Sequence, residues 1–222
     1  MSYQGVLFDL DGTLVDSVED MYMALNLTLT EVAYPIVSYA QVKTWVGNGI
    51  ATLVERALSG DTEINPDLSQ SLVDHSIVRF KLHYHDIVGD YAALYAHVET
   101  GLSALAHLPK ALVTNKDRAF TELLLNKLKL SHYFDVLICG DDTEKKPSPK
   151  PLIMACKSLD LNVDDVMMVG DSKSDILAAK NAKVDVIAVK YGYNQGYNLE
   201  DFNPEYLCEG FLDIIPILNK RN

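Results

Sequence analysis

The sequence predicts an α/β protein in which a parallel sheet flanked by helices carries a second unit made of helices alone. Two observations support this prediction. Short, continuously apolar runs alternate with helical patterns over most of the chain, and such alternation is typical of an open α/β sheet. The alternation is interrupted once, between the first and second runs, by a long segment of mostly helical pattern.

Five apolar runs are the candidate strands of this sheet. Each run is rich in Val, Ile or Leu and ends at polar or turn-forming residues. Because the runs are continuous rather than alternating, we expect both faces of the sheet to be covered, as in parallel sheets. The runs are Gly5–Leu10, Ala111–Thr114, Val136–Cys139, Val166–Val169 and Val184–Val189.

The segments between the later strands are predicted to be helices. Within 117–130, the side chains of Phe120, Leu124 and Leu128 recur every four residues. Residues at this spacing form one apolar stripe on a helix, which can pack against the sheet. The other helices predicted on this pattern are 98–108, 149–159 and 172–182.

A helical insertion is predicted between the first two strands, from about Asp16 to Asp90. Apolar residues recur there at helical spacing in three stretches. The stretches are separated by a glycine-containing loop at 47–49 and by a polar segment at 59–67. An insertion of this size can form a separate unit. The apolar stretches are Met21, Leu25, Leu29 and Val32, then 50–58, then 68–84.

The composition is that of a globular protein with an acidic surface. The 222 residues include 31 Asp and Glu against 19 Lys and Arg, a net charge of −12. This charge argues against nucleic acid or an anionic membrane as the main partner. The absence of a long apolar run or basic leader, and three widely spaced cysteines, favour a cytoplasmic location. The apolar stripes of the insertion are compatible with a monomer or a homodimer.

The strongest candidate for chemistry is the sequence DLDGT at residues 9–13, which ends the first strand. Alternation along an extended chain places the side chains of Asp9 and Asp11 on the same side, facing a crevice. Two adjacent carboxylates repel each other unless a divalent cation is present. With such a cation, one can act as nucleophile while the other exchanges a proton. The alternative is an acidic boundary between strand and turn.

A second acidic element, GDSKSD at residues 170–175, ends another strand and opens a helix. Asp171 falls at the strand end, where it can complete an all-oxygen Mg²⁺ site. Asp175 lies one helical turn further along the same face. The alternative is a cluster of helix-capping residues, with Asp171 and Ser172 as good capping types.

Two further candidates contact phosphate in this interpretation. Thr114 and Asn115 close the second strand, where a hydroxyl and free amides ahead of a helix form a phosphate cradle. A helix cap at Thr114 is the alternative. Lys146 lies in the proline-rich loop 145–151, where a lysine held extended before a proline can neutralise phosphate charge. A solvated basic turn is the alternative there.

Taken in order, these four elements resemble the four sequence motifs of the haloacid dehalogenase superfamily: DLDGT, the Thr of LVTN, the Lys of KKPSP, and GDSKSD. The resemblance covers nearly the whole chain. It implies a Rossmann-like α/β core domain formed by residues 1–16 and 93–222, and a small helical cap domain formed by 17–92. It also implies Mg²⁺ as the cofactor and a small anionic phosphorylated metabolite as the partner.

The resemblance further implies a role for each candidate residue. Asp9 would attack phosphorus, and Asp11 would protonate the leaving alkoxide and then deprotonate the hydrolytic water. Thr114 and the amide of Asn115 would hold the phosphoryl oxygens, and Lys146 would stabilise Asp9 and the transferred group. Such a set meets the needs of phosphoryl transfer, which are positioning and charge neutralisation. The implied Mg²⁺ ligands are the Asp9 side chain, the Asp11 backbone carbonyl and Asp171, with Asp175 acting through a water or a neighbouring residue.

By the same resemblance the insertion is a cap that closes over the site, with hinges near 15–17 and 90–95. The loop Gly47-Asn48-Gly49 is the expected contact with the rest of the substrate. Glycines there permit close approach, and exposed amides can receive a carboxylate. An ordinary turn between helices is the alternative. For Arg56, beside this loop, a solvated helix face is the simpler interpretation.

Within the superfamily, several stretches resemble the phosphoglycolate phosphatases of bacteria, among them TWVGNGI and VERAL in the insertion and YGYNQG near the end. The resemblance thus implies a Mg²⁺-dependent phosphatase that acts on a small phosphorylated carboxylic acid through an aspartyl-phosphate. 2-Phosphoglycolate is the first choice of substrate. The alternatives are a phosphomutase, or a nucleotidase or pyrophosphatase, on the same scaffold, and a catalytically silent binding module.

Overall fold

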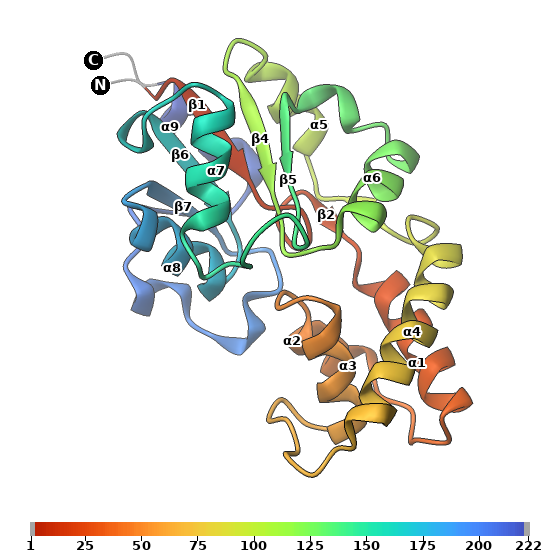
Figure 1. Cartoon of the computed structure of the whole chain (residues 1–222). Helices are drawn as coiled ribbons and strands as arrows, with labels where there is room; N and C mark the ends of the chain where they lie inside the picture. The colour runs from red at the N-terminus through yellow and green to blue at the C-terminus, as the bar shows by residue number, and fades with distance from the viewer. Residues whose placement is uncertain (1–2, 220–222) are drawn as a thin grey trace.

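The computed structural model describes residues 3–219. It consists of a six-stranded sheet flanked by helices, with a bundle of helices set to one side of it (Figure 1). Two further strands form a separate short pair. The strands are β1 Gly5–Phe8, β2 Val15–Asp16, β3 Ala93–Leu94, β4 Lys110–Val113, β5 Val136–Ile138, β6 Val166–Gly170, β7 Asp185–Val189 and β8 Tyr206–Cys208.

The helices divide between the two parts of the molecule. Four of them follow β2 and form the bundle, and the others follow β3 and lie around the sheet. The bundle consists of α1 Val18–Glu31, α2 Tyr39–Trp45, α3 Ile50–Ser59 and α4 Gln70–Ile87. The helices around the sheet are α5 Val98–Ala104, α6 Arg118–Lys127, α7 Lys150–Ser158, α8 Lys173–Ala182 and α9 Ile214–Leu218.

The six-stranded sheet is parallel throughout and has the strand order β5-β4-β1-β6-β7-β8. The first strand of the chain lies inside it, so that Val6 is paired with Lys110 of β4 on one side and Met167 of β6 on the other. All carboxyl ends therefore lie along one edge. In open α/β sheets, ligands bind in the crevice at this edge.

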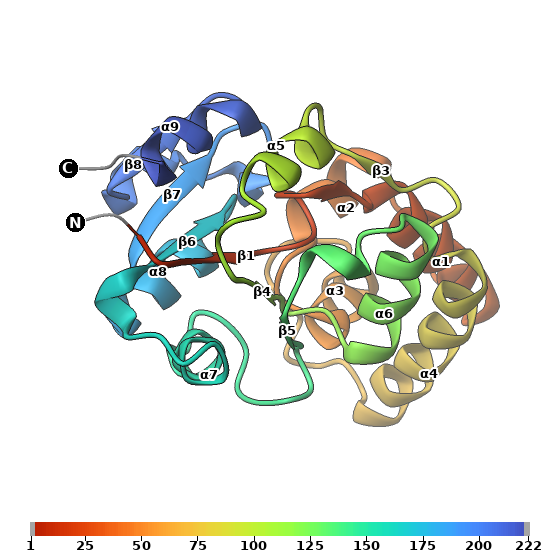
Figure 2. The same ribbon diagram turned by 90° about the horizontal axis from the view of Figure 1, so that it is seen from above.

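Apolar side chains cover both faces of the sheet, as the continuous runs predict. Phe8, Leu112 and Val169 point into the larger apolar cluster of the molecule, whereas Leu7 and Val113 point into a second cluster on the opposite face. Figure 2 shows α7 and α8 on one side of the sheet and α5 and α9 on the other. The strands are thus held from both sides, which keeps their ends in fixed positions.

The helical bundle is built around the packing of α1 against α4. The predicted stripe of α1 is buried at Met21, Leu25 and Leu29. On α4, Phe80 and Tyr84 are buried, and their rings stack with centroids 5.4 Å apart. The bundle therefore has an apolar core that it shares with the larger cluster of the sheet.

The chain leaves the sheet through β2 and returns through β3, and these two strands pair antiparallel, Val15 with Leu94 and Asp16 with Ala93. Both connections to the bundle thus lie side by side. We propose the boundary at this pair, with residues 17–92 as the cap and the remainder as the core, and use these two names below. Asp20, at the start of α1, holds the two connections together, because its carboxylate accepts the backbone N–H groups of Gly89 and Tyr91 in the segment that follows α4.

The predicted α/β fold with a helical insertion is confirmed, and each of the five predicted strands is present. Several short elements were not predicted, namely β2, β3, β8, α2 and α9. β8 is a three-residue strand at the sheet edge and is only partly buried, so its apolar run is too short to recognise. α2 is capped by Ser38, whose hydroxyl accepts the backbone N–H of Gln41 at 3.3 Å. The Ser38 and Gln41 pair is a capping box, a signal that our sequence analysis overlooked.

The expectations for the cysteines and for membrane segments can also be compared with the structure. Cys139, Cys156 and Cys208 are free and buried. Burial raises the pKa of each thiol to about 11, so little of the reactive thiolate forms at neutral pH. None of the helices in residues 3–219 is long and apolar enough to cross a membrane.

Candidate active site

The candidate catalytic residues follow the strands at the carboxyl edge of the sheet. Asp9 lies directly after β1, Thr114 after β4 and Asp171 after β6. These residues are neighbours because β1 is flanked by β4 and β6. The N–H of Asp9 donates to the carbonyl of Val169 at 2.9 Å, which extends the strand pairing by one residue and fixes the Asp9 backbone.

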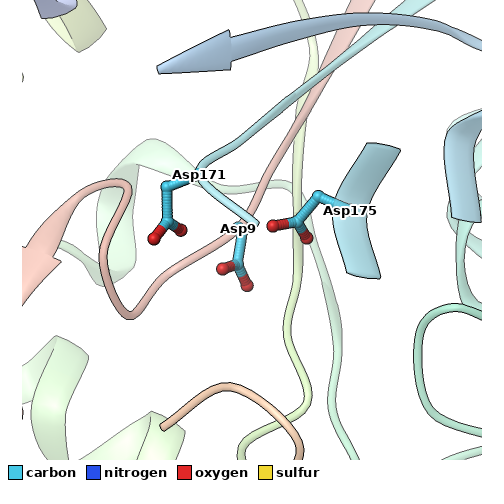
Figure 3. Close-up of side chains that lie close together, drawn as sticks. All are labelled: Asp9, Asp171 and Asp175. Atoms are coloured by element: carbon cyan, nitrogen blue, oxygen red, sulfur yellow. The ribbon is translucent and has the colours of Figure 1, made fainter. Parts of the chain in front are cut away.

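Three carboxylates gather at this edge. Asp9, Asp171 and Asp175 each offer one oxygen to a group whose atoms lie within 4.8 Å of one another, and all three residues are buried. Figure 3 shows their carboxylates turned toward a common space. Three buried negative charges at this separation repel one another and require a compensating positive charge.

Lys146, from the loop between β5 and α7, supplies part of that charge. Its buried ammonium donates to Asp9 Oδ1, Asp175 Oδ1 and the carbonyl oxygen of Val113, each at 2.7 Å. These three bonds use all three hydrogens of the ammonium. Burial lowers the pKa of Lys146, but the interactions with Asp175 and Asp9 together outweigh this effect and raise the pKa above its usual value. The side chain therefore stays cationic.

The remaining negative charge is not balanced by side chains of the site. Burial raises the pKa of Asp9 to about 7, although Lys146 opposes this, and the charge of Asp175 adds to the rise. Burial, together with the charges of Asp9 and Asp175, also raises the pKa of Asp171 well above its usual value. One ammonium against three carboxylates leaves negative charge in excess. A divalent cation that prefers oxygen ligands, such as Mg²⁺, fits this donor set.

Asp171 is fixed by two chain segments, residues 12–13 and 192–193. The hydroxyl of Thr13 donates to Oδ1 at 2.9 Å, and the N–H of Tyr193 donates to Oδ2 at 2.7 Å. A Cβ at Gly12 or at Gly192 would overlap the Asp171 carboxylate, and Gly12 also has a φ of +93°. Both the backbone conformation and the close approach therefore require glycine after the second Asp of DLDGT.

Asp175 both caps α8 and holds the lysine. Its Oδ2 accepts the N–H and the hydroxyl of Ser172 at 3.1 and 2.6 Å, while Oδ1 accepts Lys146. The Ser172 hydroxyl in turn accepts the N–H of Asp175, which completes a capping box. The two interpretations of GDSKSD, capping and function, are thus compatible. Asp175 lies in the carboxylate group itself, but protein donors already engage both of its oxygens.

Asp11 lines the same pocket as the three carboxylates but is not part of their group. Its carboxylate accepts two hydrogen bonds from the Lys116 ammonium, at 3.0 and 2.9 Å, and one from the Ser17 hydroxyl. Lys116 is only 7% exposed. Burial lowers the pKa of Lys116, but the interactions with Asp11 and Tyr84 together raise it above its usual value, so the ammonium stays charged. The two carboxylates of DLDGT therefore occupy different surroundings.

Thr114 and Asn115 lie where the cap meets the strand ends. The Thr114 hydroxyl accepts the N–H of Lys116 at 3.2 Å. The Asn115 amide donates to the carbonyls of Gly47 and Lys146, at 2.9 and 3.0 Å, and its oxygen accepts the N–H of Lys146 at 2.8 Å. The Asn115 side chain therefore ties the loop of the buried lysine to the cap, a contact that the sequence did not reveal.

The cap loop Gly47-Asn48-Gly49 sits against the core. The amide of Gln195 donates to the Val46 carbonyl and to Asn48 Oδ1, and the Asn48 amide donates to the Ser174 hydroxyl. Arg56 donates to Asn48 Oδ1 at 3.0 Å. Arg56 thus supports the loop, instead of forming the solvated face that we expected. These loop contacts use carbonyl oxygens and the Asn48 side chain.

A pocket lies between the cap and the strand ends, and the gathered carboxylates and Lys146 are part of its wall. The core side of this pocket is polar and charged. The cap side is largely apolar, so a small polar substrate would be held there away from bulk water. The apolar and aromatic residues of the cap side are Met21, Val46, Ile50, Leu53, Phe80 and Tyr84.

Sequence reasoning missed several polar residues of this pocket, among them Lys116, Tyr84 and Gln195. Lys116 had a usable signal, because it lies two residues after Thr114 in the same strand-end segment. Gln195 lies in an irregular loop with a φ of +54°, and Tyr84 belongs to a helix whose placement depends on packing. No local pattern reveals the position of either.

The chain is similar to known hydrolases over most of its length. Residues 6–189 match the family model of haloacid dehalogenase-like hydrolases. A phosphoglycolate phosphatase of Colwellia psychrerythraea is 38% identical over 218 residues, covering 97% of this chain and 96% of that protein. One of Yersinia pestis is 39% identical, covering 97% and 93%. The crystal structure of a predicted phosphoglycolate phosphatase from Haemophilus somnus 129PT has a TM-score of 0.89 at 30% identity, covering 98% of both chains.

Proposed function

The chain belongs to the haloacid dehalogenase-like hydrolase family and is a phosphoric monoester hydrolase, and we propose that it is a Mg²⁺-dependent phosphatase that converts 2-phosphoglycolate to glycolate and phosphate. The observation that carries this proposal is the ion pair between Asp9 and Lys146 within a group of three buried carboxylates. The names of the relatives support the substrate, because the phosphoglycolate phosphatases match nearly the whole chain.

In this proposal, Asp9, Asp171 and the backbone carbonyl of Asp11 would hold Mg²⁺, and Asp175 would hold Lys146. Asp175 is assigned to the lysine because its Oδ1 accepts the Lys146 ammonium while its Oδ2 caps α8. When bound, the ion would balance the charge of the carboxylates and of the phosphoryl group, which otherwise repel each other.

In the first step, an oxygen of Asp9 attacks phosphorus, and an aspartyl-phosphate forms as the bond to the ester oxygen breaks. The leaving alkoxide takes a proton from Asp11. Lys146 keeps the attacking carboxylate in place at 2.7 Å. The Thr114 hydroxyl and the Asn115 N–H would hold the phosphoryl oxygens, since both lie at the end of β4 beside β1.

In the second step, Asp11 takes a proton from water, the water oxygen attacks phosphorus, and the bond to Asp9 breaks to release phosphate. A residue that alternates between acid and base must be near the reacting groups without being bound to the metal through its carboxylate. Asp11 meets this condition, because its carboxylate is held by Lys116 and Ser17 apart from the gathered three.

A panel of phosphate esters tests the proposal. With Mg²⁺ present, we expect kcat/KM for 2-phosphoglycolate to exceed that for hexose phosphates, nucleotides and p-nitrophenyl phosphate, and EDTA to abolish all turnover. A dominant activity on nucleotides or transfer of phosphate between sugar positions would refute the substrate. Folded protein that releases no phosphate from any ester would favour a binding module.

A further inference from the structure

The second buried lysine of the pocket, Lys116, has no chemical role in the steps above. Its ammonium lies between two groups, the Asp11 carboxylate at 2.9 Å and the ring of Tyr84, whose centre is 5.0 Å away. Lys116 comes from the core and Tyr84 from α4 of the cap. The two side chains therefore meet where the cap lies on the core, and both belong to the wall of the pocket.

The hydroxyl of Tyr84 is available to a ligand. Tyr84 is only 1% exposed, and its hydroxyl has no hydrogen-bond partner at normal distance; the nearby Lys116 ammonium can only donate, so the hydroxyl hydrogen has no acceptor. A buried hydroxyl without a partner is rare, because leaving it unpaired is unfavourable. Its neighbours on the cap side of the pocket are apolar side chains such as Phe80, Ile50 and Leu53, which accept no hydrogen bond.

Lys116 is also the better placed of the two cations in the pocket wall to receive an anion. The only lysines or arginines among the described wall residues are Lys116 and Lys146. Lys146 already donates to three acceptors. The side-chain bonds of Lys116 go to one carboxylate, that of Asp11, which leaves a hydrogen free to be shared.

The proposed reaction sets where a second charge on the substrate would lie. Asp11 must reach the ester oxygen in order to protonate it. In 2-phosphoglycolate a single CH₂ group separates that oxygen from the carboxylate. The substrate carboxylate therefore lies close to the ester oxygen that Asp11 protonates. There it is within reach of the Lys116 ammonium, which already contacts Asp11.

We propose that the Lys116 ammonium and the Tyr84 hydroxyl together bind the substrate carboxylate, and that they select phosphate monoesters with a carboxylate next to the ester carbon. This inference rests on the proposed function and names the determinant of its substrate class. Because Tyr84 belongs to the cap and Lys116 to the core, the site is complete only when the cap lies on the core. Charge-assisted hydrogen bonds of this kind distinguish strongly between charged and neutral ligands.

The test compares 2-phosphoglycolate with ethyl phosphate, which resembles it but lacks the carboxylate. The quantity measured is the ratio of their kcat/KM values in the wild type and in Tyr84→Phe and Lys116→Met. We expect this ratio to fall about tenfold in Tyr84→Phe and about a hundredfold in Lys116→Met, the usual effects of losing a bond to a charged group. Lys116 also holds Asp11, so Lys116→Met slows the hydrolysis of both substrates. The ratio cancels this common effect and reports only the contribution of the carboxylate.

Two controls separate this role from a structural one. Tyr84→Phe keeps the ring that packs against Phe80 and Phe120, so it preserves the fold. Lys110→Met removes another buried lysine, at the opposite end of β4, and should leave the ratio unchanged. Lys116→Arg should restore part of the ratio, since it restores the cation.

Each outcome decides one question. If Tyr84→Phe and Lys116→Met slow both substrates by the same factor, the carboxylate site is refuted, although the phosphatase stands. If the wild type prefers ethyl phosphate, the substrate class is wrong as well. A wild type that hydrolyses neither ester removes the proposed function itself, and this is seen before any variant is made.

Discussion

The core side and the cap side of the pocket are built in different ways. On the core side, charged groups bond to one another, so that Lys146 links Asp9 to Asp175 and Asp175 caps α8. On the cap side the wall is mostly apolar, and only a few polar contacts join it to the core, such as the carbonyls of Gly47 and Val46 that accept from Asn115 and Gln195 of the core. One side is a connected polar network, and the other is a packed surface with a few anchors.

This difference indicates a division of labour. Removing any member of the core network leaves a buried charge unpaired, so little can vary there without loss of the chemistry. The apolar cap wall can change shape at lower cost, because hydrophobic positions tolerate substitution when volume is kept. We therefore expect the reaction to depend on the core side and the choice of substrate on the cap side.

The largest expected effect tests the core side directly. Asp9→Asn should lower kcat by at least about a thousandfold, because an amide cannot attack phosphorus. The far-UV circular dichroism spectrum should be unchanged. Asp164→Asn, at an exposed position, is the matched control and should keep full activity. Appreciable turnover by Asp9→Asn would remove this residue as the nucleophile.

The next effect concerns the stability of the core network. Lys146→Met leaves its buried carboxylate partners without their cation, and the free energy of unfolding in EDTA should fall by about 3 kcal/mol or more. Urea denaturation measures this change. Lys190→Met removes a lysine from exposed ion pairs and should leave the urea midpoint almost unchanged. Equal midpoints for the two variants would contradict the network.

The pH dependence of stability sharpens the same point. In the metal-free protein, the folded state keeps Asp9 protonated up to about pH 7, whereas its ordinary pKa is 3.8. The folded state then binds more protons than the unfolded one, so the unfolding free energy should fall as pH rises between these values. Asp9→Asn should make this slope shallower. Saturating Mg²⁺ should do the same in the wild type, because the ion favours the ionised carboxylate. Urea titrations at several pH values would contradict this if all slopes were equal.

The smallest effect concerns the anchors of the cap. Gln195→Ala removes the hydrogen bonds to Val46 and Asn48, and KM for the preferred substrate should rise a few-fold while kcat changes little. Steady-state kinetics measure both constants. Gln70→Ala changes an exposed cap residue that is not among the pocket residues, and it should change neither KM nor kcat. A loss confined to kcat would instead connect Gln195 to the chemistry.

The same contrast explains what the sequence could predict. Asp9, Thr114 and Asp171 lie directly after strands, and parallel pairing alone brings such positions together. That these residues lie close together therefore follows from the predicted strands and from the fact that parallel strands end at one edge of the sheet. Lys146 was found because of its proline-rich loop, although the bonds that it makes to two carboxylates depend on the folded chain.

The cap side lies beyond such rules. Tyr84 reaches the pocket because α4 packs on α1 in one particular way, and a helical stripe shows which face is buried but not what it faces. The cap loop was expected to offer amides to a substrate. In the structure its contacts to the core use the Gly47 carbonyl and the Asn48 side chain. Tertiary packing decided both positions, and no segment of the sequence contains that information by itself.

The place of β1 inside the sheet has a consequence for the newborn chain. This strand is made before both of its neighbours, which begin only at Lys110 and Val166. The cap, by contrast, is one continuous stretch, so the packing of α1 against α4 can form before the later strands are made. Pairing between distant segments is slow to form. During synthesis the apolar segment Gly5–Phe8 therefore stays unpaired while the helices of the cap are made. The polypeptide most needs a chaperone in this interval.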